Sequence, residues 1–250
     1  MWALAVNYLL CFKQPVLLPK FTQHGYHKAN IPADVYTRLK EFYYTTRARD
    51  GVTTENGDGL SAVINTDWVR TGMVQLSDDV RAAVSRALLE RMQAWCGCTL
   101  QETAFYGIRE YYRGNVLRMH VDRVETHVIS AILQVDQDLR GDDDTPADDW
   151  ALVVIDFSGR RHNVTLRPGE MLLYESATLI HGRPRAFKGR RFANCFLHYK
   201  PTSDWHWERK IVESRSVITD NDAVYEAADV INTPLTLRQN DEDAQLKTEL

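Results

Sequence analysis

The pair His120 and Asp122 stands at the end of an apolar run in GNVLRMHVDRVETHV, residues 114–128. The run alternates like a half-buried β-strand, in which side chains at positions i and i+2 leave the same face. Two imidazoles and one carboxylate on a single face suit a divalent iron ion, because the opposite coordination positions stay open for substrate and dioxygen. The pair therefore predicts either a metal site that needs a second histidine or a hydrogen-bonded pair on a wet face.

Several histidines downstream are candidates for that further ligand. His127 is expected to begin the next strand as a surface or packing residue, and His162 to lie in a solvated polar turn. His198 and His206 lie near or beyond the last expected strand, without an obvious carboxylate to orient them. His181 ends the segment SATLIH, and the basic segment after it leads into another apolar strand. His181 is therefore the strongest candidate.

Three features occur in order along the chain: HVD at 120–122, PGEMLLYESATLIHGRP at 168–184, and Arg191, ten positions past His181. Together they resemble the 2-oxoglutarate and iron(II)-dependent oxygenases, specifically the prolyl 4-hydroxylase-like branch. That family's pattern is His-x-Asp, a distal histidine and a basic residue ten positions beyond it. The resemblance covers roughly residues 100–200, with the upstream segment as a brace.

The resemblance implies three iron ligands on one face, namely His120, Asp122 and His181. Arg191 would bind the far carboxylate of the cosubstrate 2-oxoglutarate, since a guanidinium suits a bidentate ion pair. The family also has a tyrosine in a Tyr-x-x-Gly arrangement before the first histidine. This implies Tyr111 in the cosubstrate pocket, or Tyr112 if the register slips by one. Many prolyl hydroxylases have lysine where this chain has Arg191, a difference that keeps the charge.

The implied activity is hydroxylation of an unactivated C–H bond by dioxygen (O2). It is coupled to the oxidative decarboxylation of 2-oxoglutarate to succinate and CO2. Fe(II) is the implied metal, and ascorbate is a further expected cofactor. A peptide or protein, prolyl by resemblance, is the favoured substrate.

Two other functions remain open. The same chemistry could act on a small molecule or a nucleic-acid base, because a basic segment borders the expected pocket mouth, comprising Arg183, Arg185, Lys188 and Arg190. Such segments usually face water. The alternative outside the enzymes is a jelly-roll module that binds a ligand without turnover. The loops expected to set specificity are 44–75 and the aspartate-rich segment 136–150, which lacks the ligand register of an EF-hand and is expected to be solvated.

Two amphipathic helices precede the site. One begins at Pro32 and has an apolar stripe of Val35, Leu39 and Phe42. The second is expected to be capped by Ser77 and stopped by Gly97. Its apolar face consists of Val80, Val84, Leu88, Met92 and Trp95.

Short strands are expected near 104–112, 115–121, 127–135, 151–157, 161–166, 170–175, 178–181 and 191–199. Such a series without intervening helices predicts a mainly β fold, a double-stranded β-helix (jelly roll), braced by the helices on one outer face. Residues 1–100 are the expected N-terminal helical bracing region of the same domain, 101–210 the jelly-roll catalytic core, and 211–250 an acidic, flexible tail.

The bulk composition argues against two classes of partner. The chain has 30 basic and 34 acidic residues, so its charge gives no reason to expect an obligatory nucleic-acid partner. No segment reaches the roughly 20 apolar residues of a membrane span, so no membrane partner is expected.

The cysteines and the chain ends bear on the compartment. Cys11, Cys96, Cys98 and Cys195 are too few and too irregularly spaced for a disulfide framework, so all four are predicted to be free thiols. The N-terminal apolar run lacks a basic region and a cleavage site, and a cytoplasmic location is predicted. The C-terminal Lys-Thr-Glu-Leu resembles a lumenal retention signal, which makes the ER lumen the alternative.

Overall fold

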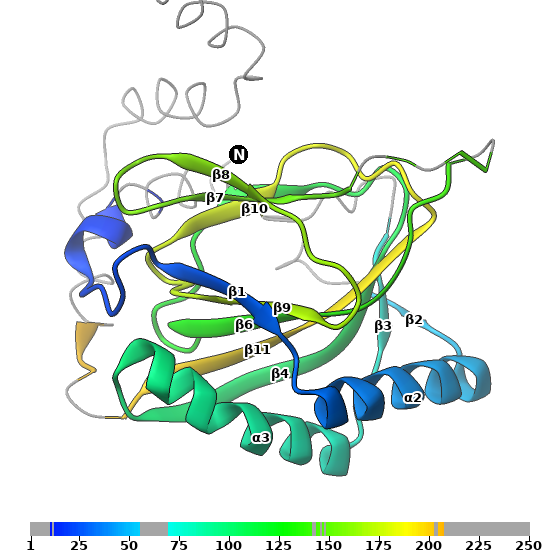
Figure 1. Ribbon diagram of the computed structural model, residues 1–250, viewed down its shortest axis with the longest axis horizontal. Coiled ribbons are helices and arrows are strands. Elements are labelled where there is room, and N and C mark those ends of the chain that lie inside the picture. Colours follow the sequence, from blue (N-terminus) through cyan, green and yellow to red (C-terminus); the bar gives the residue numbers. More distant parts are fainter. Residues whose placement is uncertain are drawn as a thin grey trace, which may run out of the picture.

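Two antiparallel β-sheets face each other in the computed structural model of the protein (Figure 1). The larger sheet has the strand order β1–β9–β6–β11–β4–β3–β2, and the smaller sheet has the order β5–β10–β7–β8. The structure describes residues 11, 13–55, 70–141, 144–145, 147, 149–202 and 205–207. The predicted mainly β jelly roll is confirmed. The predicted tail, 211–250, lies outside the described residues, and the division into three segments stays a prediction.

The eight expected strands correspond to eight observed ones. In the larger sheet these are β4 (Leu100–Tyr111), β6 (Ile129–Asp138), β9 (Glu170–Tyr174) and β11 (Arg191–Pro201). In the smaller sheet they are β5 (Leu117–His120), β7 (Leu152–Ile155), β8 (Arg161–Val164) and β10 (Ile180–Arg183).

Three further strands come from the segment that was expected to be helical with loops. They are β1 (Tyr26–Asn30), β2 (Thr53–Thr54) and β3 (Gly72–Val74), and they extend both edges of the larger sheet. Each is too short for a hydrophobic period to be recognised, and β1 has no fully buried residue. β1 is a strand because it pairs with β9, β3 because it pairs with β4, and β2 because it pairs with β3, and these partners lie outside the local sequence of each strand.

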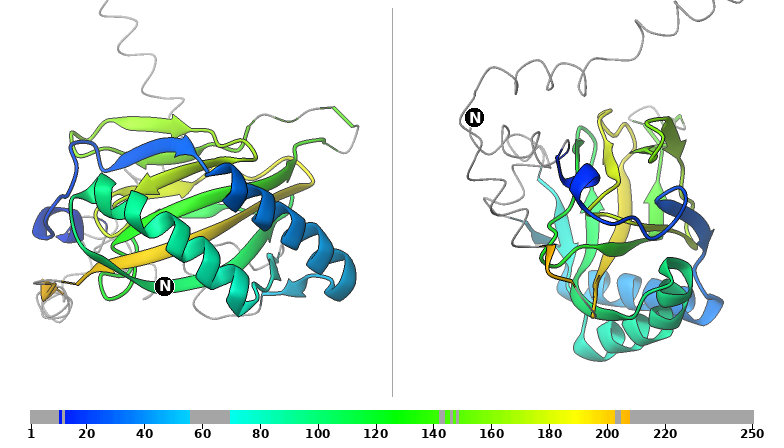
Figure 2. Two further views of the ribbon diagram at one scale, coloured as in Figure 1. Left: turned by 60° about the horizontal axis from the view of Figure 1, so that its bottom comes forward. Right: turned by 90° about the vertical axis from the view of Figure 1, so that its left-hand side faces the viewer.

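Both predicted helices are present, and they lie against the outer face of the larger sheet (Figure 2). They are α2 (Ala33–Asp50) and α3 (Asp78–Cys96). The stripes are buried largely as expected, and α3 ends at Gly97, whose φ of 66° suits glycine. Ser77 occupies the N-cap position of α3, but its side chain makes no capping hydrogen bond. No helix in the described part of the chain is long and apolar enough to cross a membrane.

Strand alternation divides the side chains of the larger sheet between two cores. On β11, Ala193, Cys195 and Leu197 pack toward the helices. Phe192 on the same strand instead packs between the two sheets, together with Tyr111 of β4. We call the side of the larger sheet that faces α2 and α3 its outer face, and the side that faces the smaller sheet its inner face. A one-residue step along a strand therefore moves a side chain from the helices to the interior.

Candidate metal centre

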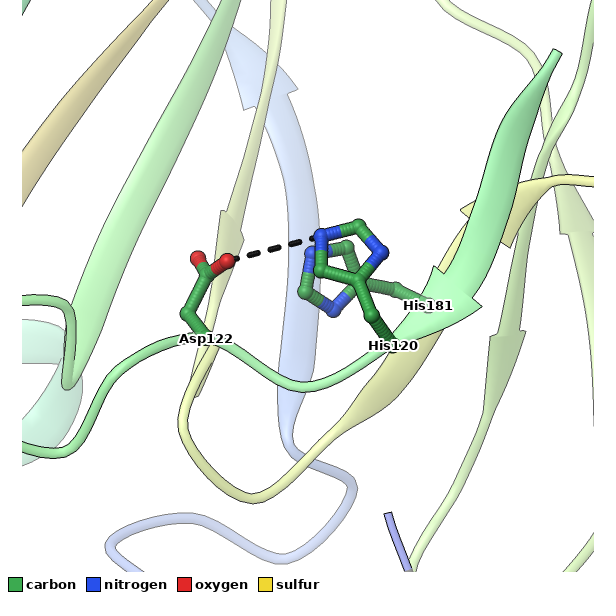
Figure 3. Close-up of side chains that lie close together, drawn as sticks. All are labelled: His120, Asp122 and His181. Atoms are coloured by element: carbon green, nitrogen blue, oxygen red, sulfur yellow. Dashed lines mark ion pairs between the residues drawn. The ribbon is translucent and has the colours of Figure 1, made fainter. Parts of the chain in front are cut away.

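The metal ligands predicted from the sequence meet at one end of the smaller sheet (Figure 3). His120 is the last residue of β5, and its antiparallel partner on β10 is His181. Asp122 follows two residues after β5, and its backbone N–H donates to the carbonyl of Ser176 at 2.8 Å. His120 and His181, 61 positions apart in the chain, thus come together through strand pairing.

The three side chains are close enough to hold one ion. Their candidate ligand atoms all lie within 4.8 Å of one another, and no other such group is found among the described residues. The two imidazole rings are 4.4 Å apart, and His120 Nε2 lies 3.5 Å from Asp122 Oδ1. Two imidazoles and a carboxylate are the donor set that suits a divalent transition metal with open positions. The residues therefore fit an iron(II) ion.

Backbone carbonyls set the orientation of both imidazoles. His120 Nδ1 lies 2.7 Å from the carbonyl oxygen of Arg118, and His181 Nδ1 lies 2.8 Å from that of Leu179. Because a carbonyl only accepts, Nδ1 must carry the hydrogen in each ring, which leaves a lone pair on Nε2. Such support is usual for metal-binding histidines.

Burial favours the protonation states that a metal requires. It lowers the pKa of His181 to about 4, with a further contribution from His120, so the imidazole is neutral at pH 7. Burial alone would raise the pKa of the Asp122 carboxyl, but His120, His181 and His198 outweigh it and hold that pKa well below its usual range. His181 is therefore a neutral imidazole and Asp122 a carboxylate, the states in which these groups bind a metal.

A second pair of histidines lines the Asp122 side of the centre. His198 Nδ1 lies 4.0 Å from Asp122 Oδ2 and 2.7 Å from the hydroxyl of Ser130. The ring of His127 is 3.8 Å from that of His198, and its Nε2 lies 3.1 Å from the hydroxyl of Tyr106. The expectation that His198 lacks a carboxylate neighbour was therefore wrong, because β11 brings it beside Asp122.

The predicted cosubstrate residues are split between the two faces. Tyr111 lies on the inner face, completely buried, with its ring 5.1 Å from that of Trp150. Tyr112 points the other way, and its hydroxyl donates to Glu110. Arg191 pairs with Asp136 at 2.5 Å and lies beside the charged groups that face α2. The structure brings Tyr111 toward the interior and leaves Tyr112 and Arg191 on the outer face.

Arg183 differs most from its sequence-based interpretation. It was placed in a basic segment bordering the pocket mouth, of a kind that usually faces water, but β10 continues through it, and its side chain is 1% exposed. Its guanidinium lies 4.9 Å from the ring of Trp150 and 5.0 Å from that of Phe192. The signal was available, because Arg183 stands only two residues after His181.

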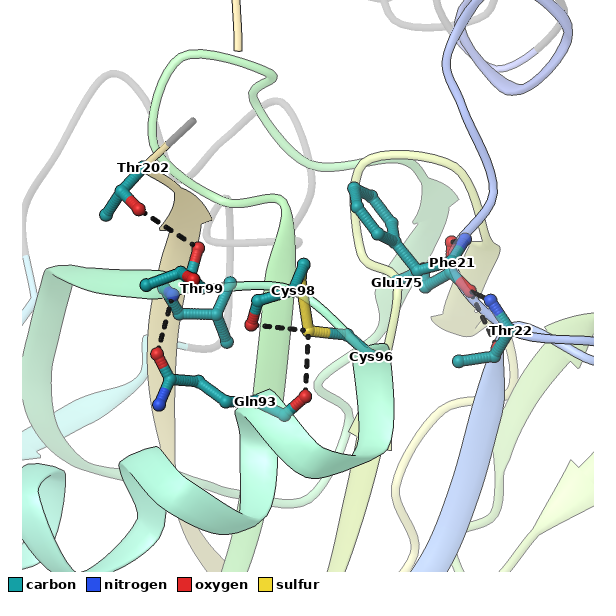
Figure 4. The surroundings of a disulfide bond; sticks show 9 residues. Phe21, Thr22, Gln93, Cys96, Cys98, Thr99, Glu175 and Thr202 are labelled. Carbon is teal, nitrogen blue, oxygen red and sulfur yellow. Dashed lines mark hydrogen bonds between the residues drawn. A yellow bond between two sulfur atoms is a disulfide. The ribbon is translucent and has the colours of Figure 1, made fainter. Parts of the chain in front are cut away.

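The cysteines take no part in the metal group. Cys96 and Cys98 form a disulfide at the end of α3, so the prediction of four free thiols was wrong (Figure 4). The turn at Gly97 brings the two residues together, and the side chain of Gln93 accepts a hydrogen bond from the N–H of Leu100 beside them. Cys11 and Cys195 are buried free thiols, as predicted.

Comparison with known proteins supports the fold. No family model and no curated sequence matches the chain. A prolyl-4-hydroxylase from Pseudomonas putida matches with a TM-score of 0.50 and 17% identity, over 79% of this chain and 98% of that one. A prolyl hydroxylase from Trichoplax adhaerens, bound to a hypoxia inducible factor peptide, matches at 0.53 and 11%, over 88% and 97%.

A third structure is HygX from Streptomyces hygroscopicus with nickel and 2-oxoglutarate bound. It matches with a TM-score of 0.51 and 14% identity, over 77% of this chain and 87% of that one. At sequence identities this low, the structural matches establish a common fold and no more. The chain therefore has the jelly-roll fold of these prolyl hydroxylases and of HygX, with a His-Asp-His group at one end of the smaller sheet.

Proposed function

We propose that the protein is a 2-oxoglutarate- and iron(II)-dependent oxygenase that hydroxylates a C–H bond. The observation that carries the proposal is the group His120, Asp122 and His181, with both imidazole Nε2 atoms free to bind a metal. When bound, iron(II) and 2-oxoglutarate would supply the oxidising chemistry, with succinate and CO2 as products. The shared fold supports the same assignment.

The chain's own residues would hold the metal and keep its surroundings dry. His120 and His181 are 7% and 3% exposed, and the rings of Tyr174 and His181 are in contact at 4.8 Å. A dry pocket strengthens each electrostatic interaction with the ligand and limits side reactions with water. The carbonyls of Arg118 and Leu179 keep the rings oriented before a metal arrives.

We propose a peptidyl, prolyl-type substrate. The two prolyl hydroxylases that share the fold support this choice, and one of them is bound to a peptide. Tyr106 offers a half-exposed aromatic surface against His127, beside the Asp122 side of the centre. A small-molecule substrate is the second candidate, because HygX, with hygromycin B bound, has the same fold.

The test has two parts on the purified protein. Iron(II) or Mn(II) binding is measured by calorimetry without oxygen, and succinate formation from 2-oxoglutarate is then followed with iron(II), ascorbate and air. His181→Ala should weaken metal binding by more than about 100-fold, since even the loss of a supporting partner costs up to that much. His27→Ala, the same change at an exposed histidine of β1, is the control and should match wild type.

The outcomes separate three functions. Metal binding with slow succinate formation, both lost in His181→Ala, supports the oxygenase, and proline-containing peptide libraries then address the substrate. Binding of 2-oxoglutarate without any turnover, with or without peptide, favours a binding module. Wild-type protein that binds neither metal nor 2-oxoglutarate contradicts the proposal.

A further inference from the structure

Arg183 is a buried cation without an anionic partner in the described part of the chain. Its Nε donates to the carbonyl of Trp150 at 3.3 Å, and its terminal Nη1 is buried with no hydrogen-bond partner. Aromatic rings of Trp150 and Phe192 flank the guanidinium. Rings of this kind stabilise a cation partially, and they leave its hydrogen-bond donors unused.

A second unused polar group lies in the same cluster. Tyr111 is completely buried, and its hydroxyl makes no hydrogen bond of good geometry to a described residue. Tyr111 and Arg183 lie near each other, and both pack around Trp150. The Arg109 guanidinium also lies near this hydroxyl. Two different side chains, from β4 and β10, therefore present polar atoms without partners in one interior region.

Two arginines of the larger sheet show what is missing at Arg183. Arg109 forms two hydrogen bonds to the carboxylate of Glu55, at 2.7 and 3.0 Å, and Arg191 pairs with Asp136. Both are thus neutralised by the fold. Burying an unpaired charge costs several kcal/mol, so a protein keeps one chiefly where a ligand completes the pair. Arg183 is in that position.

This region adjoins the metal centre. His181 and Arg183 stand two residues apart on β10, and both are buried. The ring of Tyr174 contacts that of His181 at 4.8 Å, and Tyr174 also lies near Arg183 and Tyr111. Tyr174 therefore connects the candidate metal ligands to the Arg183 region.

We infer that Arg183 and Tyr111 form a carboxylate-binding subsite that holds the far end of an acid whose other end binds at the metal centre. The inference rests on the proposed function, in which that acid is 2-oxoglutarate. It replaces Arg191 as the carboxylate-binding residue. The guanidinium would donate from Nη1 and the hydroxyl from Tyr111, so that both unused groups gain an acceptor.

The test compares two ligands in the Mn(II)-loaded protein by calorimetry. One is 2-oxoglutarate, and the other is 2-oxoglutaramate, in which an amide replaces the distal carboxylate. Wild type should prefer the acid by about 100-fold, the value of a charge-assisted hydrogen-bonded pair. Arg183→Met should reduce the preference to near one, whereas Arg191→Met, the matched control, should keep it. Mn(II) affinity should stay within about twofold in both variants, because neither residue is a metal ligand.

Tyr111→Phe provides an independent variant that removes one oxygen atom and keeps the ring. It should weaken 2-oxoglutarate binding by about tenfold, the value of a single hydrogen bond. The metal-free melting temperature of Tyr111→Phe and Arg183→Met should equal or exceed that of wild type, because each removes an unpaired buried polar group. A purely structural role for either residue would instead lower it.

The outcomes distinguish the inference from the proposed function. Wild type that binds neither Mn(II) nor 2-oxoglutarate overturns both. If wild type binds both Mn(II) and 2-oxoglutarate, two results overturn the inference alone. One is that wild type shows no preference for the acid over the amide, and the other is that Arg191→Met, rather than Arg183→Met, abolishes the preference. Loss of the preference in Arg183→Met with unchanged metal affinity supports it.

Discussion

Two clusters of buried polar groups, one on each face of the larger sheet, differ in how they are paired. On the outer face, the Glu110 carboxylate accepts hydrogen bonds from the Tyr43 hydroxyl at 2.5 Å, from Arg47 Nε at 2.7 Å and from the Tyr112 hydroxyl at 2.7 Å. On the inner face, polar atoms of Tyr111 and Asn194 are buried without such partners. Glu110 and Tyr111 are neighbours on β4.

The difference indicates which polar groups serve the fold and which serve a ligand. A buried group that the protein itself satisfies contributes to stability and is costly to remove. A buried group that the protein leaves unsatisfied lowers stability until something binds to it. Replacing outer-face residues should therefore change stability, and replacing inner-face residues should change binding.

The largest expected effect in stability is at Glu110. Glu110→Ala leaves the buried Tyr43 hydroxyl without its acceptor and should lower the free energy of unfolding by about 3 kcal/mol. Urea unfolding measures the change. Metal affinity of the folded protein should be unaffected, and Glu110→Gln should restore part of the loss. A Glu110→Ala variant that is as stable as wild type but binds metal poorly would contradict the conclusion that Glu110 serves the fold.

The Gln14 side chain tests whether a paired donor near the candidate metal centre behaves like the outer face: its Nε2 is paired, whereas its Oε1 is buried without a hydrogen-bond partner among the described residues. Its Nε2 donates to the carbonyls of Asp122 at 2.7 Å and Ala177 at 2.8 Å, from a completely buried position. Gln14→Ala should cost about 2 kcal/mol and weaken metal binding by about tenfold, because the Asp122 backbone loses a support. Calorimetry and thermal unfolding check this, with exposed Gln23→Ala as control. Unchanged stability would contradict the pairing argument.

The ion pair of Arg191 and Asp136 should contribute less, because both side chains are partly exposed, at 23% and 14%. A double-mutant cycle with Arg191→Gln and Asp136→Asn should give a coupling energy of about 1 kcal/mol in unfolding. The cycle should give no coupling in 2-oxoglutarate affinity. Coupling in 2-oxoglutarate affinity would assign Arg191 a role in cosubstrate binding and contradict the difference between the faces.

Reduction of the Cys96–Cys98 disulfide should have the smallest effect. The bond joins residues two apart, so it restricts the unfolded chain little, and its loss should cost no more than about 1 kcal/mol. Melting temperatures of the Cys96→Ser and Cys98→Ser variants, with and without reductant, measure this. Metal affinity should not change, since the bond lies at the end of α3. A change in metal affinity would link this turn to the site.

The candidate metal ligands could be predicted from the sequence because short-range patterns mark them. His120 is the last residue of β5 and Asp122 follows two residues later, and His181 lies in an apolar segment that pairs with the same strand. The strands themselves also followed from local composition. The short strands β1–β3 did not, because their pairing partners lie far away in the chain.

The cosubstrate residues show the limit of spacing as a guide. The ten-residue interval selects Arg191, but the side to which a residue points depends on where its strand begins and where it bulges. The pairing of β10 with β5 shifts between His181 and Arg183, within the counted interval. A count along the chain carries no information on such shifts. The choice between Tyr111 and Tyr112 was undecided for the same reason.

The sequence by itself determined the candidate metal ligands, the two bracing helices and the mainly β fold, because these depend on side-chain type and short-range periodicity. Only the tertiary structure decided which arginine is neutralised and which is not. Arg191 has Asp136 beside it, whereas Arg183 has aromatic rings, the Trp150 carbonyl and the nearby Tyr111 hydroxyl, and no carboxylate in the described part of the chain. A charge's partners come from strands far apart in the chain, so its pairing exists only after the sheets have formed.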